Sequence, residues 1–197
     1  MSRSVRRFLI MIAGSLIIGA GVAVVIAGDL GSDSMTTLEQ GISRFLNIDM
    51  SLAPLVANGL FVLALLAVNR RRVSVDTLLC PFLITLGIKA ANQLLPQVSG
   101  MAMRVVCLVL GYLIIALGIG VGAQSETGSN PYDGFVLALA EKLNMDYRIV
   151  RWIVDIAVLL IGVLLGGSFG IGTFYAIAVT GITAKIFIEL LKKHIRA

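Results

Sequence analysis

The chain has 197 residues, of which 58% are hydrophobic and only 14% are charged, and its mean hydropathy is +0.97. A soluble domain is typically about one quarter charged, so this composition excludes an ordinary soluble protein and indicates an integral membrane protein. The formal net charge of +5 does not indicate a nucleic-acid partner. The basic residues flank apolar segments, where membrane topology alone accounts for them.

Six apolar segments are suited to helices that cross the hydrocarbon core of a bilayer, which needs about 20 residues. If the N-terminus is cytoplasmic, twelve Lys and Arg residues lie at or near the cytoplasmic side and two lie outside. This bias predicts a multi-pass protein with both termini in the cytoplasm. The predicted spans are 7–28, 51–69, 75–95, 103–124, 148–166 and 170–190.

An internal repeat relates the two halves of the chain at an offset of 97 residues. Residues 14–50 and 111–147 align without a gap and are identical at 11 of 37 positions. Each half, 1–97 and 98–197, then contains three spans, and an odd number requires the halves to enter the membrane from opposite sides. The predicted fold is an all-α membrane protein, with six transmembrane helices in two inverted three-helix repeats that form one compact domain. Such repeats are typical of transporters, although duplication of a packing unit would leave the same pattern.

Two polar elbows follow the first span of each repeat and lead into a short extra helix. "GSDS" at 31–34 aligns with "GSNP" at 128–131. Asp33 and Asn130 are suited to cap the helices, and Asp133 is placed to complete a capping box. Capping explains these residues without a ligand, but a helix N-terminus inside the protein would also bind an anionic group. The candidate binding residues of the elbows are Ser32, Asp33, Ser129, Asn130 and Asp133.

The two short helices that follow the elbows differ in pattern. Residues 34–46 are predicted to form an amphipathic helix at the membrane interface. Its apolar face contains Met35, Leu38, Ile42 and Phe45, opposite Glu39, Ser43 and Arg44. Residues 131–143 are apolar on every side and too short to span a bilayer, which predicts a re-entrant or protein-buried segment.

Charged residues inside spans are costly and usually face a cavity or a partner. Asp155 is the clearest case, and Arg151 lies one helical turn before it on the same face. The two form either a structural ion pair or part of a binding site. Lys185 is expected in the same half of the membrane, on the sixth span. In the other half, Asn58 and Lys89 are candidates, and Asn58 aligns with Asp155 in the register of the repeat.

No motif for nucleotide binding, hydrolysis or metal binding is found, and Cys80 and Cys107 fall in separate apolar segments. The sequence therefore predicts no enzymatic activity, no catalytic residue, no metal and no cofactor. The expected partners are the lipid bilayer and an unknown small solute, for which an anion is one candidate. A homodimer or a partner subunit is compatible with this pattern.

The second half of the chain resembles the YczE-type integral membrane proteins of bacteria, which are often grouped with YitT-like proteins. The motifs that carry this resemblance are "GSNPYDG" at 128–134, the run of Arg148, Arg151 and Asp155, and "LLGGSFGIGTF" at 164–174. The resemblance is strongest over 111–190, and the position of Asp155 is often Glu in that family. It implies a multi-pass protein of the bacterial plasma membrane and names no substrate.

Three functions fit these observations. The first is a small-solute or ion transporter whose site lies between the repeats. The second is a membrane-embedded substrate-binding subunit that takes its energy from a partner, and the third is a scaffold or regulator that transports nothing. The sequence favours the transporter, because inverted repeats commonly build a site near their interface.

Overall fold

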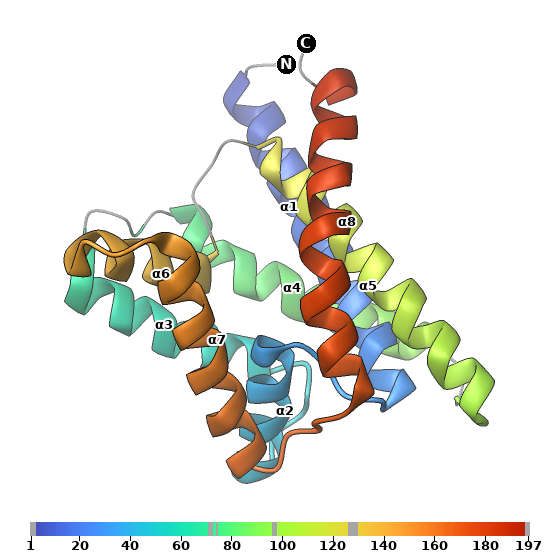
Figure 1. The fold of residues 1–197 in the computed structure, drawn as a ribbon. Helices are drawn as coiled ribbons and strands as arrows, with labels where there is room; N and C mark the ends of the chain where they lie inside the picture. The colour runs from blue at the N-terminus through green and yellow to red at the C-terminus, as the bar shows by residue number, and fades with distance from the viewer. Residues whose placement is uncertain (1–2, 71–72, 74, 96–97, 126–129, 196–197) are drawn as a thin grey trace. The chain divides into compact units, whose positions relative to one another are not determined.

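The computed structural model describes residues 3–70, 73, 75–95, 98–125 and 130–195. Every regular element in these ranges is a helix, which confirms the all-α class (Figure 1). In chain order the helices are α1 (Arg3–Gly28), α2 (Ser34–Leu46), α3 (Ala53–Asn69), α4 (Val75–Leu94), α5 (Met101–Ala123), α6 (Pro131–Leu143), α7 (Tyr147–Leu164) and α8 (Ile171–Ile195).

Three helices are long and apolar enough to cross a membrane, and they contain Val5–Gly28, Thr77–Leu94 and Met101–Ala123. The other three predicted spans are helical too. Helix α3 is apolar but has only 17 residues, and α7 has three charged residues in its 18-residue length. These three helices support membrane association by their length and composition, while the complete six-span arrangement stays a prediction.

The helices recur at the offset found in the sequence. Adding 97 to the bounds of α2, Ser34–Leu46, gives the bounds of α6, Pro131–Leu143. The same shift places α1 over α5, α3 over α7 and α4 over α8, with ends that differ by a few residues. Each half of the chain thus folds into the same succession of four helices.

The helices pack into two compact units, each of which takes equivalent helices from both halves of the chain. The first unit contains residues 1–33, 83–127 and 168–197, and therefore α1, α5, α8 and the second part of α4. The second unit contains residues 34–82 and 128–167, and therefore α2, α3, α6, α7 and the first part of α4.

In the first unit, α1 and α5 lie against each other in antiparallel directions, with glycines at the contact. A methyl group on Gly21 would lie 2.8 Å from the backbone nitrogen of Ile115, and one on Gly118 would lie 2.8 Å from that of Ile18. These two contacts exchange under the offset of 97, because Gly21 aligns with Gly118 and Ile18 with Ile115. Small residues permit this close approach of backbones, as is common between membrane helices.

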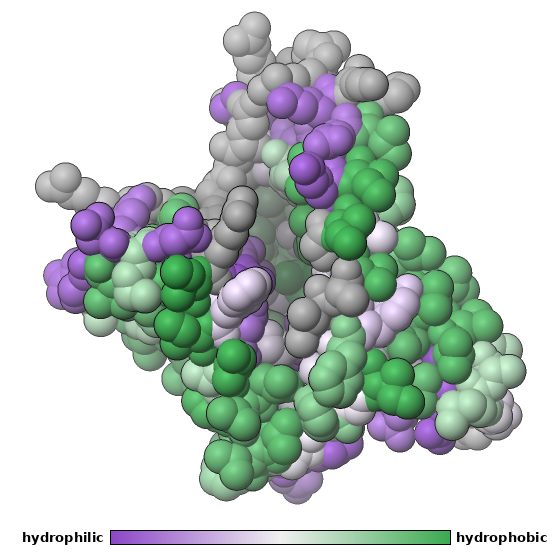
Figure 2. All heavy atoms as spheres, viewed as in Figure 1, coloured by the Kyte–Doolittle hydropathy of each residue, from purple (hydrophilic) through white to green (hydrophobic). Residues whose placement is uncertain are grey.

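In the second unit, α6 is buried against α3 and α7, as the protein-buried alternative for residues 131–143 predicts. Its Tyr132 and Val136 belong to the core of the unit, together with Ala57 of α3 and Val150 of α7. Val154 and Val158 of α7 join the same core, whereas Trp152 on the outside of that helix is 70% exposed. Hydrophobic side chains cover much of the visible surface, as expected for a protein in contact with lipid (Figure 2).

The prediction for α2 holds for Leu38 and Ile42, which are buried in the core of the second unit, and is wrong for two residues, Glu39 and Phe45. Glu39 is only 5% exposed, whereas Phe45 of the predicted apolar face is 70% exposed. The cause is the close packing of α2 on α7, where a methyl group on Gly162 would lie 2.6 Å from the backbone nitrogen of Leu38. The buried polar residues of α2 are Thr36, Thr37, Glu39 and Gln40, and each has an interaction partner.

The glycine contact between α1 and α5 predicts a selective loss of stability. In Gly118→Ala the added methyl group meets the backbone of α1, so we expect a lower melting temperature of the detergent-solubilised protein. In the control Gly59→Ala, no atom lies within 4 Å of the added group, and the better helix propensity of alanine raises stability by up to about 1 kcal/mol. Equal melting temperatures for the two variants would contradict the contact.

Candidate functional site

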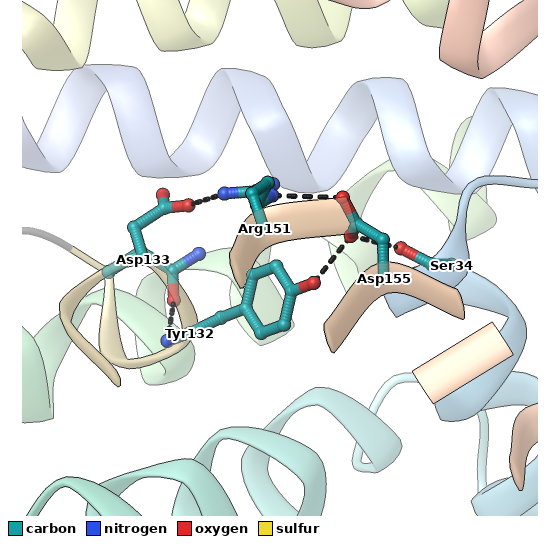
Figure 3. A network of polar contacts seen from close by, with 6 residues as sticks. Ser34, Tyr132, Asp133, Arg151 and Asp155 are labelled. Atoms are coloured by element: carbon teal, nitrogen blue, oxygen red, sulfur yellow. Dashed lines mark hydrogen bonds and ion pairs between the residues drawn. The ribbon is translucent and has the colours of Figure 1, made fainter. Parts of the chain in front are cut away.

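The side chain of Asp155 on α7 accepts hydrogen bonds from three helices of the second unit (Figure 3). The Ser34 hydroxyl at the start of α2 donates to Oδ1 of Asp155 over 2.8 Å. The Tyr132 hydroxyl, in the first turn of α6, donates to the same oxygen. Arg151 of α7 donates from Nε to Oδ2 over 3.0 Å. One carboxylate therefore joins the two elbow helices and the fifth predicted span.

The local sequence explains why α6 presents Tyr132 at this point. The side chain of Asn130 accepts a hydrogen bond from the Tyr132 backbone nitrogen at 3.2 Å, and Pro131 occupies the first helical position. This cap, predicted from the sequence, fixes where the helix starts. Ser34 and Pro131 are equivalent in the repeat and are the first residues of α2 and α6. Both elbow helices therefore direct their first turn at Asp155.

Arg151 connects Asp155 to a second carboxylate. Its guanidinium forms ion pairs with Asp155 at 3.0 Å and with Asp133 of α6. The Arg151–Asp155 pair predicted from the sequence is confirmed. Asp133 was expected to complete a capping box with Asn130, but its side chain pairs with Arg151 instead, because α7 brings the guanidinium alongside the first turn of α6. Two carboxylates thus share one cationic group.

Tyr132 orients the cluster through its ring as well as its hydroxyl. The Arg151 guanidinium carbon lies 4.6 Å from the ring centroid, within the range of a cation–π contact. On another side, the ring of Phe61 on α3 meets it edge-on, with 4.9 Å between centroids. Burial of Tyr132, followed by its hydrogen bond to Asp155, raises the pKa of this phenol above its usual range. Its hydroxyl therefore stays a donor at physiological pH.

The charged members of the cluster remain partly open to the surroundings. The exposed fraction of the side chain is 33% for Arg151, 32% for Asp155 and 44% for Asp133. Tyr132, by contrast, is only 3% exposed. The two carboxylates are therefore partly exposed, while the tyrosine against them is buried.

The other predicted site residues have different surroundings. Asn58 is buried in the second unit, on α3. Ser32 is buried in the first unit, and Lys89 and Lys185 are exposed there, on α4 and α8. Ser129 lies outside the described residues. The cluster at Asp155 thus contains Asn130, Asp133 and Arg151 from the predicted set.

The first elbow is held by close backbone contacts within the first unit. Gly31 has a positive φ of 95°, and a methyl group on it would lie 2.5 Å from the backbone nitrogen of Gly170. The Asp33 backbone nitrogen donates to the Tyr112 hydroxyl over 2.8 Å. Gly172 donates from its backbone nitrogen to the carbonyl of Leu30 over 2.8 Å. These contacts give Gly31 and Asp33 a packing role.

Sequence reasoning missed Ser34 and Tyr132, the two hydroxyl donors to Asp155. Ser34 was predicted as the first residue of the helix over 34–46 and aligned with Pro131, but it was given no role in the site. Tyr132 stands between two residues that were singled out, Asn130 and Asp133. A buried tyrosine hydroxyl usually has a hydrogen-bond partner, and this rule was the available signal.

Metal ligands do not gather in the part of the chain that the structure describes, where no group of three or more His, Cys, Asp or Glu side chains is found. Cys80 and Cys107 are both buried, and neither forms a disulfide within the described residues. The chemistry available at Asp155 is therefore acid, base and hydrogen-bond chemistry from carboxylates, hydroxyls and one guanidinium.

The whole chain was compared with known proteins. The protein belongs to DUF6198, a family of unknown function, which matches residues 5–189. An uncharacterized protein of Haemophilus influenzae is 25% identical over 177 residues, which cover 90% of this chain and 81% of that protein. The uncharacterized protein YyaS of Bacillus subtilis is 20% identical over 184 residues, or 92% of each chain. No solved structure matches. The relatives place the family in bacteria, and the site must be interpreted from its own geometry.

The hydroxyl of Tyr132 predicts a measurable contribution to stability. In Tyr132→Phe the aromatic contacts with Phe61 remain, and the interactions of the hydroxyl with Asp155 and Ser34 are lost. A hydrogen bond to a charged group contributes about 1.5–3 kcal/mol, so we expect a loss of this order in chemical unfolding of the detergent-solubilised protein. Tyr175→Phe in the first unit, where the ring packs against Tyr112, is the matched control. A loss no greater than that of the control would contradict the bond.

Proposed function

We propose that the protein is a transporter of a small solute or ion in the bacterial plasma membrane, and that it binds its solute at Asp155. The observation that carries the proposal is the convergence of both elbow helices on one carboxylate. Ser34 belongs to the first repeat and Tyr132 to the second, and both donate to the same oxygen of Asp155. A site that draws on both repeats is what inverted-repeat transporters use.

Several features support two parts of this proposal, the location in the membrane and the inverted relation of the two repeats. Three helices have the length and apolarity of membrane spans, and the distribution of Lys and Arg favours cytoplasmic termini. Helices α1 and α5, which are equivalent in the repeat, run antiparallel, as an inversion requires. The resemblance to YczE-type and YitT-like membrane proteins agrees with this proposal.

The geometry also provides a way to couple binding to movement. Each elbow helix is attached to Asp155 by one hydroxyl, so displacement of α2 or α6 breaks one bond to the carboxylate. A solute that offers its own hydrogen-bond donors competes with these hydroxyls for the same oxygen. Solute binding therefore favours an arrangement in which an elbow helix is released. Movement of one repeat against the other around a fixed site is the usual form of alternating access.

The anionic solute predicted from the elbows fits this cluster less well than a solute that carries donors. Arg151 is engaged with both Asp133 and Asp155. An anion that bound Arg151 would have to displace one of these carboxylates and would meet the repulsion of the other. We therefore propose a solute that presents N–H groups, O–H groups or positive charge to Asp155.

The second candidate function is a membrane-embedded substrate-binding subunit, and the third is a scaffold or regulator. Both can be separated from a transporter by reconstituting the purified chain alone in liposomes. A transporter moves its solute without a partner. Dependence of uptake on a co-purifying ATPase would favour the binding subunit, and absence of any ligand would favour the scaffold.

The test begins with a thermal-shift screen of the solubilised protein against metabolites and ions, and the compound that stabilises it is used for uptake into proteoliposomes. We expect Asp155→Asn to lower uptake at least tenfold and to change the melting temperature much less, because the amide keeps an oxygen acceptor but loses the charge. Asp29→Asn, in the first unit, is the matched control and should leave uptake unchanged. If Asp155→Asn lowers uptake only in proportion to the folded fraction, Asp155 is a structural ion-pair partner.

A further inference from the structure

We propose that the solute of this protein is a small guanidinium or amidinium cation, and that it binds in the place that the Arg151 side chain occupies in this structure. This inference rests on the proposed function, because it takes the cluster at Asp155 as the solute site. It adds the chemical class of the solute and assigns binding roles to Asp133 and to the ring of Tyr132.

One cationic group already contacts three members of the cluster at once. The Arg151 guanidinium donates from Nε to Oδ2 of Asp155 over 3.0 Å, and from Nη1 to Oδ1 of Asp133 on α6. Its central carbon also lies 4.6 Å from the centroid of the Tyr132 ring. Figure 3 shows the guanidinium between the two carboxylates, near the ring. The two carboxylates and the ring are therefore spaced to contact a single guanidinium.

This spacing favours a planar cation with several N–H groups. A guanidinium holds its N–H donors in one plane and in fixed directions, so it can bond two carboxylates and still present its face to an aromatic ring. An ammonium group is a compact point charge without such a face. Asp133 and Asp155 belong to different helices, α6 and α7, and Tyr132 supplies the aromatic face. An amidinium has the same planar, charged N–H groups and fits for the same reason.

The charge of the cluster also favours a cation over an anion. Asp133, Asp155 and Arg151 are charged groups that the structure places in direct contact, and together they carry one net negative charge. A cation between the two carboxylates relieves their mutual repulsion, whereas an anion would add to it. A cationic solute can therefore replace the Arg151 guanidinium without leaving the carboxylates uncompensated.

Arg151 is held by contacts that a solute can take over. Its side chain is 33% exposed, and partly exposed ion pairs contribute little to stability. Exchange of these pairs for equivalent pairs with a solute therefore changes the stability of the unit little. The Tyr132 ring, by contrast, belongs to a residue that is only 3% exposed, and it packs edge-on against Phe61. The ring thus stays in place while the flexible arginine side chain moves aside.

The experiment uses the full-length protein in lipid nanodiscs and follows thermal unfolding through Trp152, the single tryptophan. Methylguanidinium chloride is titrated against NaCl at constant ionic strength and at millimolar concentrations, far below those that denature proteins. N-Methylurea has a similar planar shape without the charge, and tetramethylammonium chloride has the charge without N–H groups. We expect methylguanidinium to raise the melting temperature in a saturable way, and neither of the two controls to do so.

Asp133→Asn tests the second carboxylate, because it leaves the bonds of Asp155 with Ser34 and Tyr132 in place. It should weaken the apparent affinity for methylguanidinium at least tenfold. Glu141→Gln is the matched control, since it makes the same change of charge at an exposed position more than two turns further along α6. It should leave the affinity unchanged.

Arg151→Gln removes the tethered cation that competes with the solute, so we expect it to tighten the binding of methylguanidinium at least tenfold. Binding to Arg151→Gln with none to the wild type would overturn the inference, because methylguanidinium would then only fill the space that the arginine left. If Asp133→Asn does not fold, the comparison of Arg151→Gln with the wild type decides instead.

The inference is also overturned if methylguanidinium does not stabilise the wild type saturably, which would make Arg151 a permanent ion-pair partner. Equal stabilisation by N-methylurea or tetramethylammonium would overturn the assigned solute class, and so would unchanged affinity in Asp133→Asn. Failure of the transporter proposal looks different. Saturable binding of methylguanidinium without flux of any solute in proteoliposomes would remove transport and keep the binding site. Asp155-dependent uptake of another solute without binding of methylguanidinium would remove only the solute class.

Discussion

The second unit depends on one physical constraint, which is the need to keep the Asp155 carboxylate satisfied among apolar helices. A carboxylate in such surroundings is unfavourable unless donors and opposite charge compensate it. Here the compensation comes from Ser34, Tyr132 and Arg151. Because the two hydroxyls belong to α2 and α6, the same bonds that stabilise the charge also hold both short helices against α7. Truncating this side chain would therefore remove a contact that three helices share.

The two repeats use the same backbone plan with different chemistry. At the first position of the short helices, Ser34 donates to Asp155, whereas its equivalent Pro131 has no N–H and starts α6. At the polar position of the third helix in each half, Asp155 is charged and Asn58 is neutral. The two halves therefore share the same succession of helices but differ in the residues at these polar positions.

The helices were predictable from the sequence because their signals are local. Apolar run length predicted the helices to within a few residues, and the Arg151–Asp155 pair followed from helical spacing. The offset of 97 likewise anticipated that α2 and α6 have the same length. The cap at Asn130 was predictable for the same reason, since it joins residues two apart.

The polar contacts of the site were not predictable, because they depend on tertiary packing. Ser34 and Asp155 are separated by 121 residues, and no pattern in either segment specifies the other. Helix α2 shows this most clearly. Its periodicity predicted an exposed polar face, yet Glu39 is buried because Gly162 allows α7 to approach the backbone of α2. The apolar face follows the periodicity only in part, since Leu38 and Ile42 join the core while Phe45 is exposed.

Helix α7 contributes to both an apolar core and a polar cluster. Its Val150, Val154 and Val158 belong to the core of the second unit, whereas Arg151 and Asp155 meet α6 and α2. On another side of the helix, Trp152 and Ile156 are exposed. This exposed apolar surface suits contact with lipid or another apolar surface, since in water it would favour association. The segment that builds the polar cluster therefore also favours an apolar environment, because the exposed apolar side chains and the charges belong to the same 18-residue helix.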